Sequence, residues 1–331
     1  MAKDIFRKRK KRRNLLPLLL ICLLAVMLAG GLVFWTLSQR APEPGSSQQQ
    51  STEDQTPSVT PVRVLPKEFI DRNTYSPFVV LYDATDDRLL YSKNADELCY
   101  PASLTKLMTA IIAVENADPD TVFTVGNEIN MIGAGSSRAY LTVGSKMNLT
   151  QLLQAMLLPS GNDAAYVTAV QVGRILAGDP NLDRYAAVSK FCEAMNRKAK
   201  ELGCSNTQFV NPDGWHEFDH YTTVSDMLKI VLEAIDHPLI VEVTSQPSAK
   251  VTLLSGQTTT WRNSNRLIQP DNADYYEGAF GLKTGTTDEA GRCLAACATR
   301  EGRTTVAIVM GASTDNGRWD DARGLLDISF Q

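Results

Sequence analysis

The sequence predicts an α/β fold in which an antiparallel sheet is formed from both ends of a long C-terminal body, with a helical lobe inserted between them. Near each end of this body, two apolar runs surround a short polar break, which is the pattern of a β-hairpin. Between the two hairpins, apolar residues recur at helical spacing. The strands at both ends are therefore expected to pair with one another and to enclose the helices as an insertion.

The two hairpins can be placed by residue. The first joins Phe78–Tyr82 to Leu89–Tyr91, and the second joins Cys293–Thr299 to Thr304–Met310. A further strand, Phe280–Lys283, is expected to lead into the second hairpin.

Two helices are predicted from apolar residues three and four positions apart. The first is marked by Leu104, Leu107, Met108, Ile111 and Ile112, and the second by Leu149, Leu152, Leu153, Met156 and Leu157. Both lie between the hairpins, so we assign them to the inserted lobe.

The N-terminus differs in charge from the rest of the chain. Its first 13 residues hold eight Lys or Arg and one Asp, and since the formal net charge of the whole chain is −4, the remainder carries −11. An acidic body is a poor binder of nucleic acid. We therefore expect no nucleic-acid partner.

Leu15–Ser38 is a stretch of 24 residues without a charge. As a helix it spans roughly 36 Å, enough for the ~30 Å hydrocarbon core of a bilayer. The run is longer than the apolar region of a secretory signal peptide, and no clean Ala-x-Ala site follows it. We predict a single-pass signal-anchor in the cell membrane, with residues 1–14 in the cytoplasm and the body outside. A cleaved signal peptide is the alternative.

Residues 39–66 are rich in Pro, Ser, Thr and Gln and offer little to bury. This composition predicts a disordered linker, with an r.m.s. span on the order of 30 Å. The remaining residues, 67–331, are numerous enough for one domain or for two lobes that share a cleft.

Three short motifs carry the chemistry. Ser103-Leu-Thr-Lys106 places a hydroxyl and an amine one helical turn apart, and Ser160-Gly-Asn162 and Lys283-Thr-Gly285 follow in that order. Ser103 needs a base to become a nucleophile, and Lys106 can be that base once burial or a nearby cation such as Lys283 lowers the pKa of its amine. Each motif alone is weak, but the three in this order predict a serine enzyme that attacks an amide.

The three motifs resemble those of the penicillin-recognising serine enzymes. Within that group, Pro101–Thr109, Ser160–Ala165 and Lys283–Gly291 are similar to the low-molecular-mass serine-type D-Ala-D-Ala carboxypeptidases of peptidase family S11, as are Thr207–Gly214 and His220–Asp226. The resemblance covers about residues 70–330. It implies the transpeptidase/β-lactamase-like fold, which has the same α/β arrangement, and a single catalytic domain over residues 67–331.

The resemblance also implies a role for each catalytic residue. Ser103 would be the nucleophile, with Lys106 as its base. Ser160 would pass a proton to the leaving D-alanine, and Asn162 would hold the substrate amide.

Substrate binding is implied at the last motif and beyond it. Lys283 and Thr284 would grip the terminal carboxylate on the strand that continues through Gly285, with Arg318 behind that carboxylate. The backbone N–H groups of Thr286 and of the nucleophile would bind the oxyanion.

The expected function is removal of the terminal D-alanine of peptidoglycan pentapeptides through an acyl-enzyme, without a cofactor. Stem peptides would be the substrates, and β-lactams would acylate the enzyme as inhibitors. One alternative is a β-lactamase, against which the absence of a Glu-x-x-Leu-Asn pentapeptide counts. The other is a penicillin-binding sensor or inactive wall-binding module, which the short N-terminal basic segment disfavours.

Two departures from the family's pattern stand out. The chain stops at Phe330-Gln331 without the C-terminal β-rich domain and amphipathic tail, so we expect the N-terminal anchor to replace that tail. Ile268–Gly278, just before the last motif, matches no family pattern and is a candidate for shaping substrate preference.

The cysteines and histidines of the sequence do not form a metal-binding motif. Five cysteines lie in the body, an odd number, so at least one is free or pairs between chains. We expect buried thiols, with Cys293 and Cys297 on one face of a central strand. His216 and His220 have the spacing of metal ligands, but they follow the turn signal Asn211–Gly214. We therefore expect no metal site.

Overall fold

The fold is described from a computed structural model of the chain, which describes residues 68, 70–71 and 74–331. The basic segment, the predicted anchor and the predicted linker lie outside the described residues. Within the described part, no helix is both long and apolar enough to cross a bilayer.

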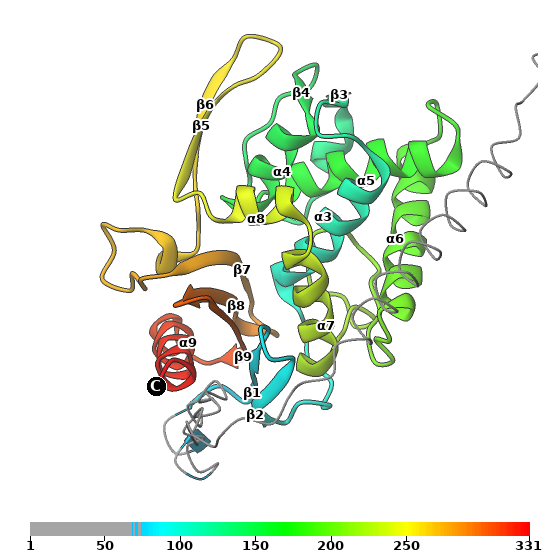
Figure 1. Cartoon of the computed structure of the whole chain (residues 1–331). Helices are drawn as coiled ribbons and strands as arrows, with labels where there is room; N and C mark the ends of the chain where they lie inside the picture. Colours follow the sequence, from blue (N-terminus) through cyan, green and yellow to red (C-terminus); the bar gives the residue numbers. More distant parts are fainter. Residues whose placement is uncertain (1–67, 69, 72–73) are drawn as a thin grey trace, which may run out of the picture. The chain divides into compact units, whose positions relative to one another are not determined.

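A five-stranded antiparallel sheet stands at the centre of the described body (Figure 1). Its strand order is β2–β1–β9–β8–β7, with the bounds Arg88–Lys93, Phe78–Asp83, Arg303–Ala312, Gly291–Arg300 and Ala279–Thr287. Both predicted hairpins are confirmed, as is the strand that leads into the second one. The two ends of the body meet where β1 pairs with β9, with Phe78 opposite Met310.

The sheet is buried on both faces, which explains why its strands read as nearly continuous apolar runs. On β9, Val306, Ile308 and Met310 belong to one hydrophobic cluster, whereas Ala307 and Val309 belong to the other. This alternation is the two-residue period of a strand.

Helix α9 (Asp315–Ser329) covers one face of the sheet, as Figure 1 shows in red. Its buried Trp319 and Leu326 join the cluster that contains Leu81 and Leu294. The helix begins at the N-cap Thr314, whose hydroxyl accepts a hydrogen bond from the N–H of Gly317.

The helical lobe lies on the other face (Figure 1). Its helices are α3 (Thr105–Asn116), α4 (Leu149–Leu157), α5 (Asn162–Ala177), α6 (Arg184–Glu201), α7 (Val224–Ile235) and α8 (Pro238–Thr244). Two short hairpins accompany them: β3 (Val122–Thr124) with β4 (Lys146–Asn148), and β5 (Ser248–Thr252) with β6 (Thr258–Arg262). Three 3₁₀ turns complete the described elements: η1 (Ala102–Leu104), η2 (Asn127–Asn130) and η3 (Arg266–Ile268).

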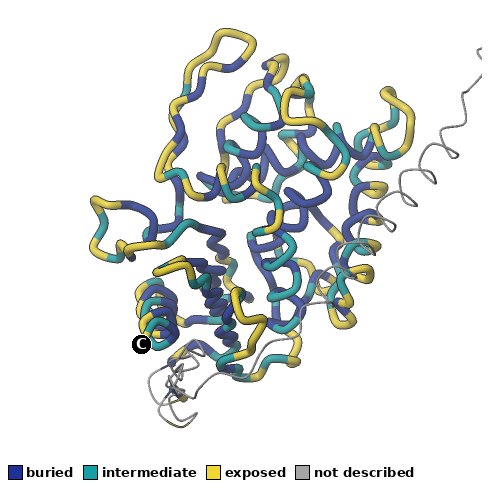
Figure 2. The backbone as a smooth tube through the Cα atoms, viewed as in Figure 1, coloured by how far each residue is buried: buried dark blue, intermediate teal, exposed yellow. Residues whose placement is uncertain are grey.

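The two helices predicted from periodicity are α3 and α4. Helix α3 is buried along Thr105–Ala113, on all sides rather than on one stripe, because α4, α5, α6, α7 and α8 all pack against it (Figure 2). This central position lets α3 carry a charged side chain into the interior, where its surroundings control its pKa.

The five described cysteines are free and buried, as expected. Cys293 and Cys297 both belong to the cluster on the helical face of β8. Burial raises the pKa of the Cys297 thiol well above its ordinary value, and it raises that of Cys293 to about 11. These thiols are therefore inert packing groups.

Candidate active site

Ser103 lies in η1, two residues before α3 begins. The turn in front of it is strained, because Ala102 has a left-handed φ of +47°. Gly214 sits directly against this turn: a Cβ on Gly214 would lie 1.8 Å from the carbonyl oxygen of Ala102. Only glycine can therefore occupy position 214, and its close approach holds the Ser103 turn in place.

Lys106 is fully buried one turn further along. Its Nζ donates to Ser103 Oγ at 2.8 Å, to Asn162 Oδ1 at 2.7 Å and to the carbonyl oxygen of Asp213 at 2.6 Å. Burial lowers the pKa of the amine to about 8, although the carboxylates of Asp213 and Asp163 act to raise it. The pKa of Lys106 is thus close to the pH at which a general base works best.

Of the two sequence-based explanations for the lowered pKa of Lys106, burial is the dominant one. Lys283 is itself buried, and its Nζ donates to the carbonyl oxygen of Thr284 at 3.0 Å. Burial, and then the charges of Lys106 and Arg318, lower its own pKa well below the ordinary value. Two ammonium groups in the same buried region act on one another reciprocally, so each disfavours protonation of the other.

The Ser160-Gly-Asn162 motif forms the turn into α5. Ser160 has a left-handed φ of +62° and is 7% exposed, and Asn162 is the first residue of the helix. The Asn162 oxygen accepts the bond from Lys106, which leaves the amide N–H groups of Asn162 as donors for another acceptor. The buried carboxylate of Asp163 accepts backbone bonds from Ala139 and Leu141 and so ties the preceding loop to this turn.

Strand β7 brings the third motif against the first. A Cβ on Gly285 would lie 3.1 Å from both the backbone nitrogen of Ser103 and the carbonyl oxygen of Pro101. The absence of a side chain at Gly285 therefore allows β7 to pass next to Ser103. Thr284 is buried beside it, and its hydroxyl shares a hydrogen bond of 2.6 Å with Ser264.

Arg318 reaches the same strand from α9. Its Nη1 donates to the Gly285 carbonyl oxygen at 3.1 Å and to Thr286 Oγ1 at 3.0 Å, while its Nη2 is paired with Asp315. The structure thus places all of the sequence-predicted site residues on three adjoining pieces: the Ser103 turn with α3, the turn into α5, and β7 with Arg318.

Comparison with known proteins identifies this arrangement. Residues 71–314 match the family described as D-alanyl-D-alanine carboxypeptidase, peptidase S11. The chain belongs to this family. One curated relative, the D-alanyl-D-alanine carboxypeptidase DacF of Bacillus subtilis, is 33% identical over 257 residues, which are 76% of this chain and 61% of DacF. The chain therefore spans less than two thirds of that relative.

Solved structures agree with the family assignment. The crystal structure of the Streptomyces K15 DD-transpeptidase superposes with a TM-score of 0.71 at 30% identity, covering 78% of this chain and 97% of that one. Penicillin-binding protein D2 of Listeria monocytogenes, in its ampicillin-bound form, gives 0.63 at 28% identity, covering 78% and 98%. The fold expected from the three motifs is confirmed.

Asp213 is one of two site residues that sequence reasoning missed in this S11 chain. Its backbone carbonyl accepts from Lys106 and lies 3.5 Å from the Ser103 hydroxyl. Its side chain is buried, so its pKa is raised, and one carboxylate oxygen accepts from the N–H of Trp215. The sequence marked the surrounding segment Thr207–Gly214 by its turn signal and by the family resemblance, but a contact made by a backbone carbonyl leaves no mark on residue type.

Ser264 was also missed. Its hydroxyl meets Thr284, and its backbone N–H donates to the Leu158 carbonyl at 2.8 Å. Ser264 therefore connects β7 to the end of α4, just before the Ser160 turn. No sequence signal marked it, because it lies in an irregular segment between β6 and β7.

His220 has a structural role, because its two ring nitrogens link separate segments. Its Nδ1 accepts from the backbone N–H of Val210 at 3.1 Å, so Nε2 carries the hydrogen and donates to Thr105 Oγ1 at 2.8 Å. Burial lowers its pKa to about 3, so the ring is neutral at ordinary pH. His220 thus fastens the loop that contains Asp213 to the start of α3.

A single cluster of possible metal ligands occurs within the described part of the chain, at Glu115, Glu233 and His237. Lys198 Nζ already contacts both carboxylates, at 2.7 Å from Glu233. The ammonium group provides the positive charge there, and the cluster joins α3, α6 and α7 as a structural ion-pair network.

Proposed function

We propose that this chain is a serine carboxypeptidase that removes the terminal D-alanine of peptidoglycan pentapeptides. The observation that carries the proposal is the 2.8 Å hydrogen bond between a buried amine, Lys106, and the hydroxyl of Ser103, with the pKa of that amine lowered to about 8. A neutral amine at this distance can take the proton of the hydroxyl as it attacks. The names of the S11 relatives support the substrate class.

The first half-reaction forms an ester. The Ser103 oxygen attacks the carbonyl carbon of the penultimate D-alanine, and its proton passes to Lys106. The backbone N–H groups of Ser103 and Thr286 bind the oxyanion, and losing one such donor costs on the order of 10²–10³ in rate. The C–N bond then breaks, and the proton held by Lys106 passes through the Ser160 hydroxyl to the departing amine, which leaves Lys106 neutral again.

The second half-reaction regenerates the enzyme. A water molecule gives a proton to Lys106 and attacks the ester, which releases the shortened peptide and restores the Ser103 hydroxyl. Asn162 holds the amide of the peptide, and Lys283, Thr284 and Arg318 bind the terminal carboxylate in the first step.

The test uses the full chain, incubated with diacetyl-Lys-D-Ala-D-Ala and, separately, with a fluorescent penicillin. We expect release of free D-alanine and a long-lived penicilloyl adduct, both lost in Ser103→Ala. Rapid loss of the adduct would identify a β-lactamase, and an adduct without D-alanine release would identify a sensor. An added amino-acid acceptor separates hydrolysis from transpeptidation, the activity in the name of the K15 protein.

We infer from the sequence that Leu15–Ser38 anchors the enzyme in the cell membrane and that the body is extracytoplasmic. The full-length protein is expected to pellet with membranes, to resist a high-salt wash and to keep its N-terminus, because a hydrophobic attachment is insensitive to ionic strength. Protease added outside should cleave within residues 39–66. A mature N-terminus near residue 40 would contradict the anchor without affecting the proposed reaction.

A further inference from the structure

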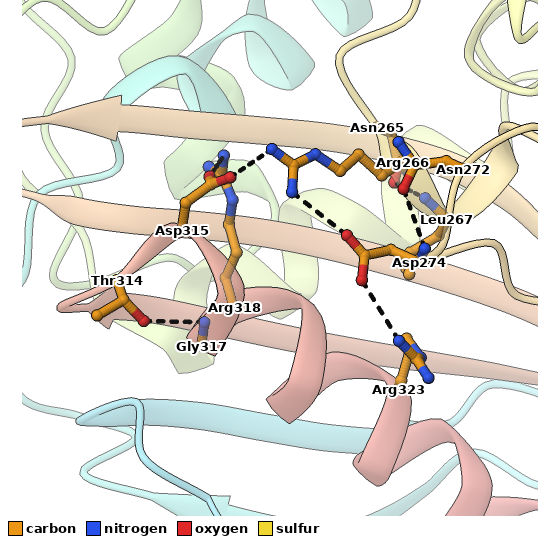
Figure 3. Close-up of polar contacts among 10 residues, drawn as sticks. All are labelled: Asn265, Arg266, Leu267, Asn272, Asp274, Thr314, Asp315, Gly317, Arg318 and Arg323. Atoms are coloured by element: carbon orange, nitrogen blue, oxygen red, sulfur yellow. Dashed lines mark hydrogen bonds and ion pairs between the residues drawn. The ribbon is translucent and has the colours of Figure 1, made fainter.

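Five side chains of alternating charge form a row beside the carboxylate-binding end of the site (Figure 3). Both ends of the row lie on α9, and its order is Arg318, Asp315, Arg266, Asp274, Arg323. Arg318, at one end, contacts β7. Each aspartate lies between two arginines. The proposed reaction uses only Arg318, so the other four charges have no assigned role.

Asp315 controls both the orientation and the charge of Arg318. It holds Nη2, so that Nη1 is directed to Gly285 and Thr286 on β7. The same pairing has a cost for binding, because a carboxylate beside Arg318 cancels its charge and competes with the carboxylate of a substrate. Asp315 is the first residue of α9, where the helix dipole also stabilises its negative charge.

Arg266 offsets this cost. Its Nη2 lies 2.6 Å from the second oxygen of Asp315, so one carboxylate is shared between two guanidinium groups. The trio Arg318–Asp315–Arg266 then has a net charge of +1. Both arginines lie over the ring of Trp319, with Cζ at 4.8 Å from its centroid for Arg318 and 5.4 Å for Arg266.

Arg266 is fixed in turn by the segment that follows it. It begins η3, whose N-cap Asn265 accepts from the N–H of Leu267, and its Nη1 pairs with Asp274 at 3.3 Å. Asp274 is shared with Arg323 in the same way, at 3.3 Å. Asp274 lies within Ile268–Gly278, the segment that matched no family pattern, so this segment supports the carboxylate end of the site.

We propose that Arg266 and Asp315 are positioning residues for Arg318: Asp315 aims its guanidinium at β7, and Arg266 keeps the carboxylate-binding end positively charged by sharing Asp315. The proposal rests on the proposed function in one respect, the binding of a substrate carboxylate at Arg318. It adds two residues that act through Arg318 and touch no substrate.

The test compares acylation of the full chain by a penicillin, which carries a carboxylate, with acylation by its methyl ester, which carries none. Mass spectrometry of the acyl-enzyme over time gives a rate constant for each. In Arg266→Gln we expect the penicillin rate to fall about tenfold and the ester rate to stay within twofold. Arg266→Lys should retain most of the penicillin rate.

Two further variants separate charge from folding. Arg323→Gln, which breaks an equivalent ion pair at the far end of the row, is expected to change neither rate by more than about twofold. Arg266→Gln combined with Asp315→Asn restores a net charge of +1 and is expected to recover part of the lost penicillin rate. If Arg266 had a purely structural role, Arg266→Gln would lower the penicillin and ester rates together. Adding Asp315→Asn would then lower both rates further.

Each outcome bears on the proposal. An equal loss for penicillin and ester in Arg266→Gln, or no loss for either, would overturn it. Wild-type protein that is acylated but releases no D-alanine would contradict the carboxypeptidase function and still report on Arg266. Wild-type protein that is acylated by neither the penicillin nor its methyl ester would overturn both the proposed function and the proposed roles of Arg266 and Asp315.

Discussion

In the proposed reaction, the amine of Lys106 has to be protonated in some steps and neutral in others. Its three acceptors, Ser103, Asn162 and the Asp213 carbonyl, suit an ammonium group, whereas burial favours the neutral form. The balance puts its pKa at about 8. A modest change in pH around 8 therefore alters the fraction of Lys106 that is neutral.

The pH dependence of acylation follows from this pKa. The rate constant for penicillin is expected to fall about tenfold per pH unit below pH 8 and to level off above it, because only the neutral amine accepts the Ser103 proton. Stopped-flow or mass-spectrometric rates between pH 6 and 10 check this. Lys106→Arg should be nearly inactive, since a guanidinium keeps its proton, while the exposed Lys190→Arg should behave as wild type. A flat profile would place the base elsewhere.

The neutral ring of His220 predicts how stability depends on pH. Burial lowers its pKa in the folded state to about 3, whereas in the unfolded chain it has the ordinary value of about 6.5. Between these values the unfolded chain binds the extra proton, so the free energy of unfolding decreases as the pH falls. His220 contributes a loss of about 2 kcal/mol between pH 6.5 and pH 5.

Urea unfolding at the two pH values measures this contribution. His220→Gln should be less stable at pH 6.5, because the bond to Thr105 is weakened, and should lose less stability than wild type on acidification. Equal losses in the two proteins would mean that His220 titrates alike in the folded and unfolded states.

At the scale of single residues, the contacts made by side chains of the site could be predicted from the sequence, whereas those made by the backbone could not. Ser103, Lys106 and Asn162 were predicted as site residues because their motifs specify the side chains, and the structure joins them by hydrogen bonds. The Asp213 carbonyl could not be predicted, since every residue type has one. The Arg266–Asp315 pair joins positions 49 apart in the sequence, and only the tertiary fold makes them neighbours.

At the scale of elements, the strands and helices of the core were predictable because each has a regular apolar period. The hairpins at both chain ends and helices α3 and α4 follow that rule. The turns that shape the site do not, because they depend on close contacts between distant segments. The contact between Gly214 and the Ala102 turn is the tightest of these.

Substitution of Gly214 should therefore disable the site. Gly214→Ala puts a Cβ 1.8 Å from the Ala102 carbonyl at a φ of +81°, so the Ser103 turn or the 211–214 loop has to move. We expect penicillin acylation to fall by more than about tenfold, since displacements of about 1 Å cost on the order of 10²-fold. Gly203→Ala is the matched control: its φ is +75° with nothing within 4 Å. It should lower stability by about 1 kcal/mol and leave acylation unchanged.

If the two alanine variants acylate at the same rate, the Gly214 contact does not control the nucleophile. Circular dichroism and thermal melting of both variants separate a displaced turn from a failure to fold.

At the scale of the whole described body, the site is a junction between the sheet and the helical lobe. Ser103 precedes the buried helix α3, Ser160 and Asn162 begin α5, and Lys283 lies on β7. A ligand attached to Ser103 with its carboxylate at β7 thus contacts both parts. Because the two parts share the core that surrounds α3, they are expected to unfold together.

Acylation should therefore raise the melting temperature of the body in a single transition. An acylated site that adds about 2 kcal/mol corresponds to a shift of about 4–8 °C for a domain of this size. Calorimetry with and without penicillin measures the shift, with penicillin hydrolysed at its β-lactam ring as the control for non-covalent binding. Ser103→Ala should fold normally and show no shift with intact penicillin. If acylation stabilised only one of two separate transitions, the sheet and the helical lobe would be independent folding units, and the site would have to be assembled by the ligand rather than by the fold.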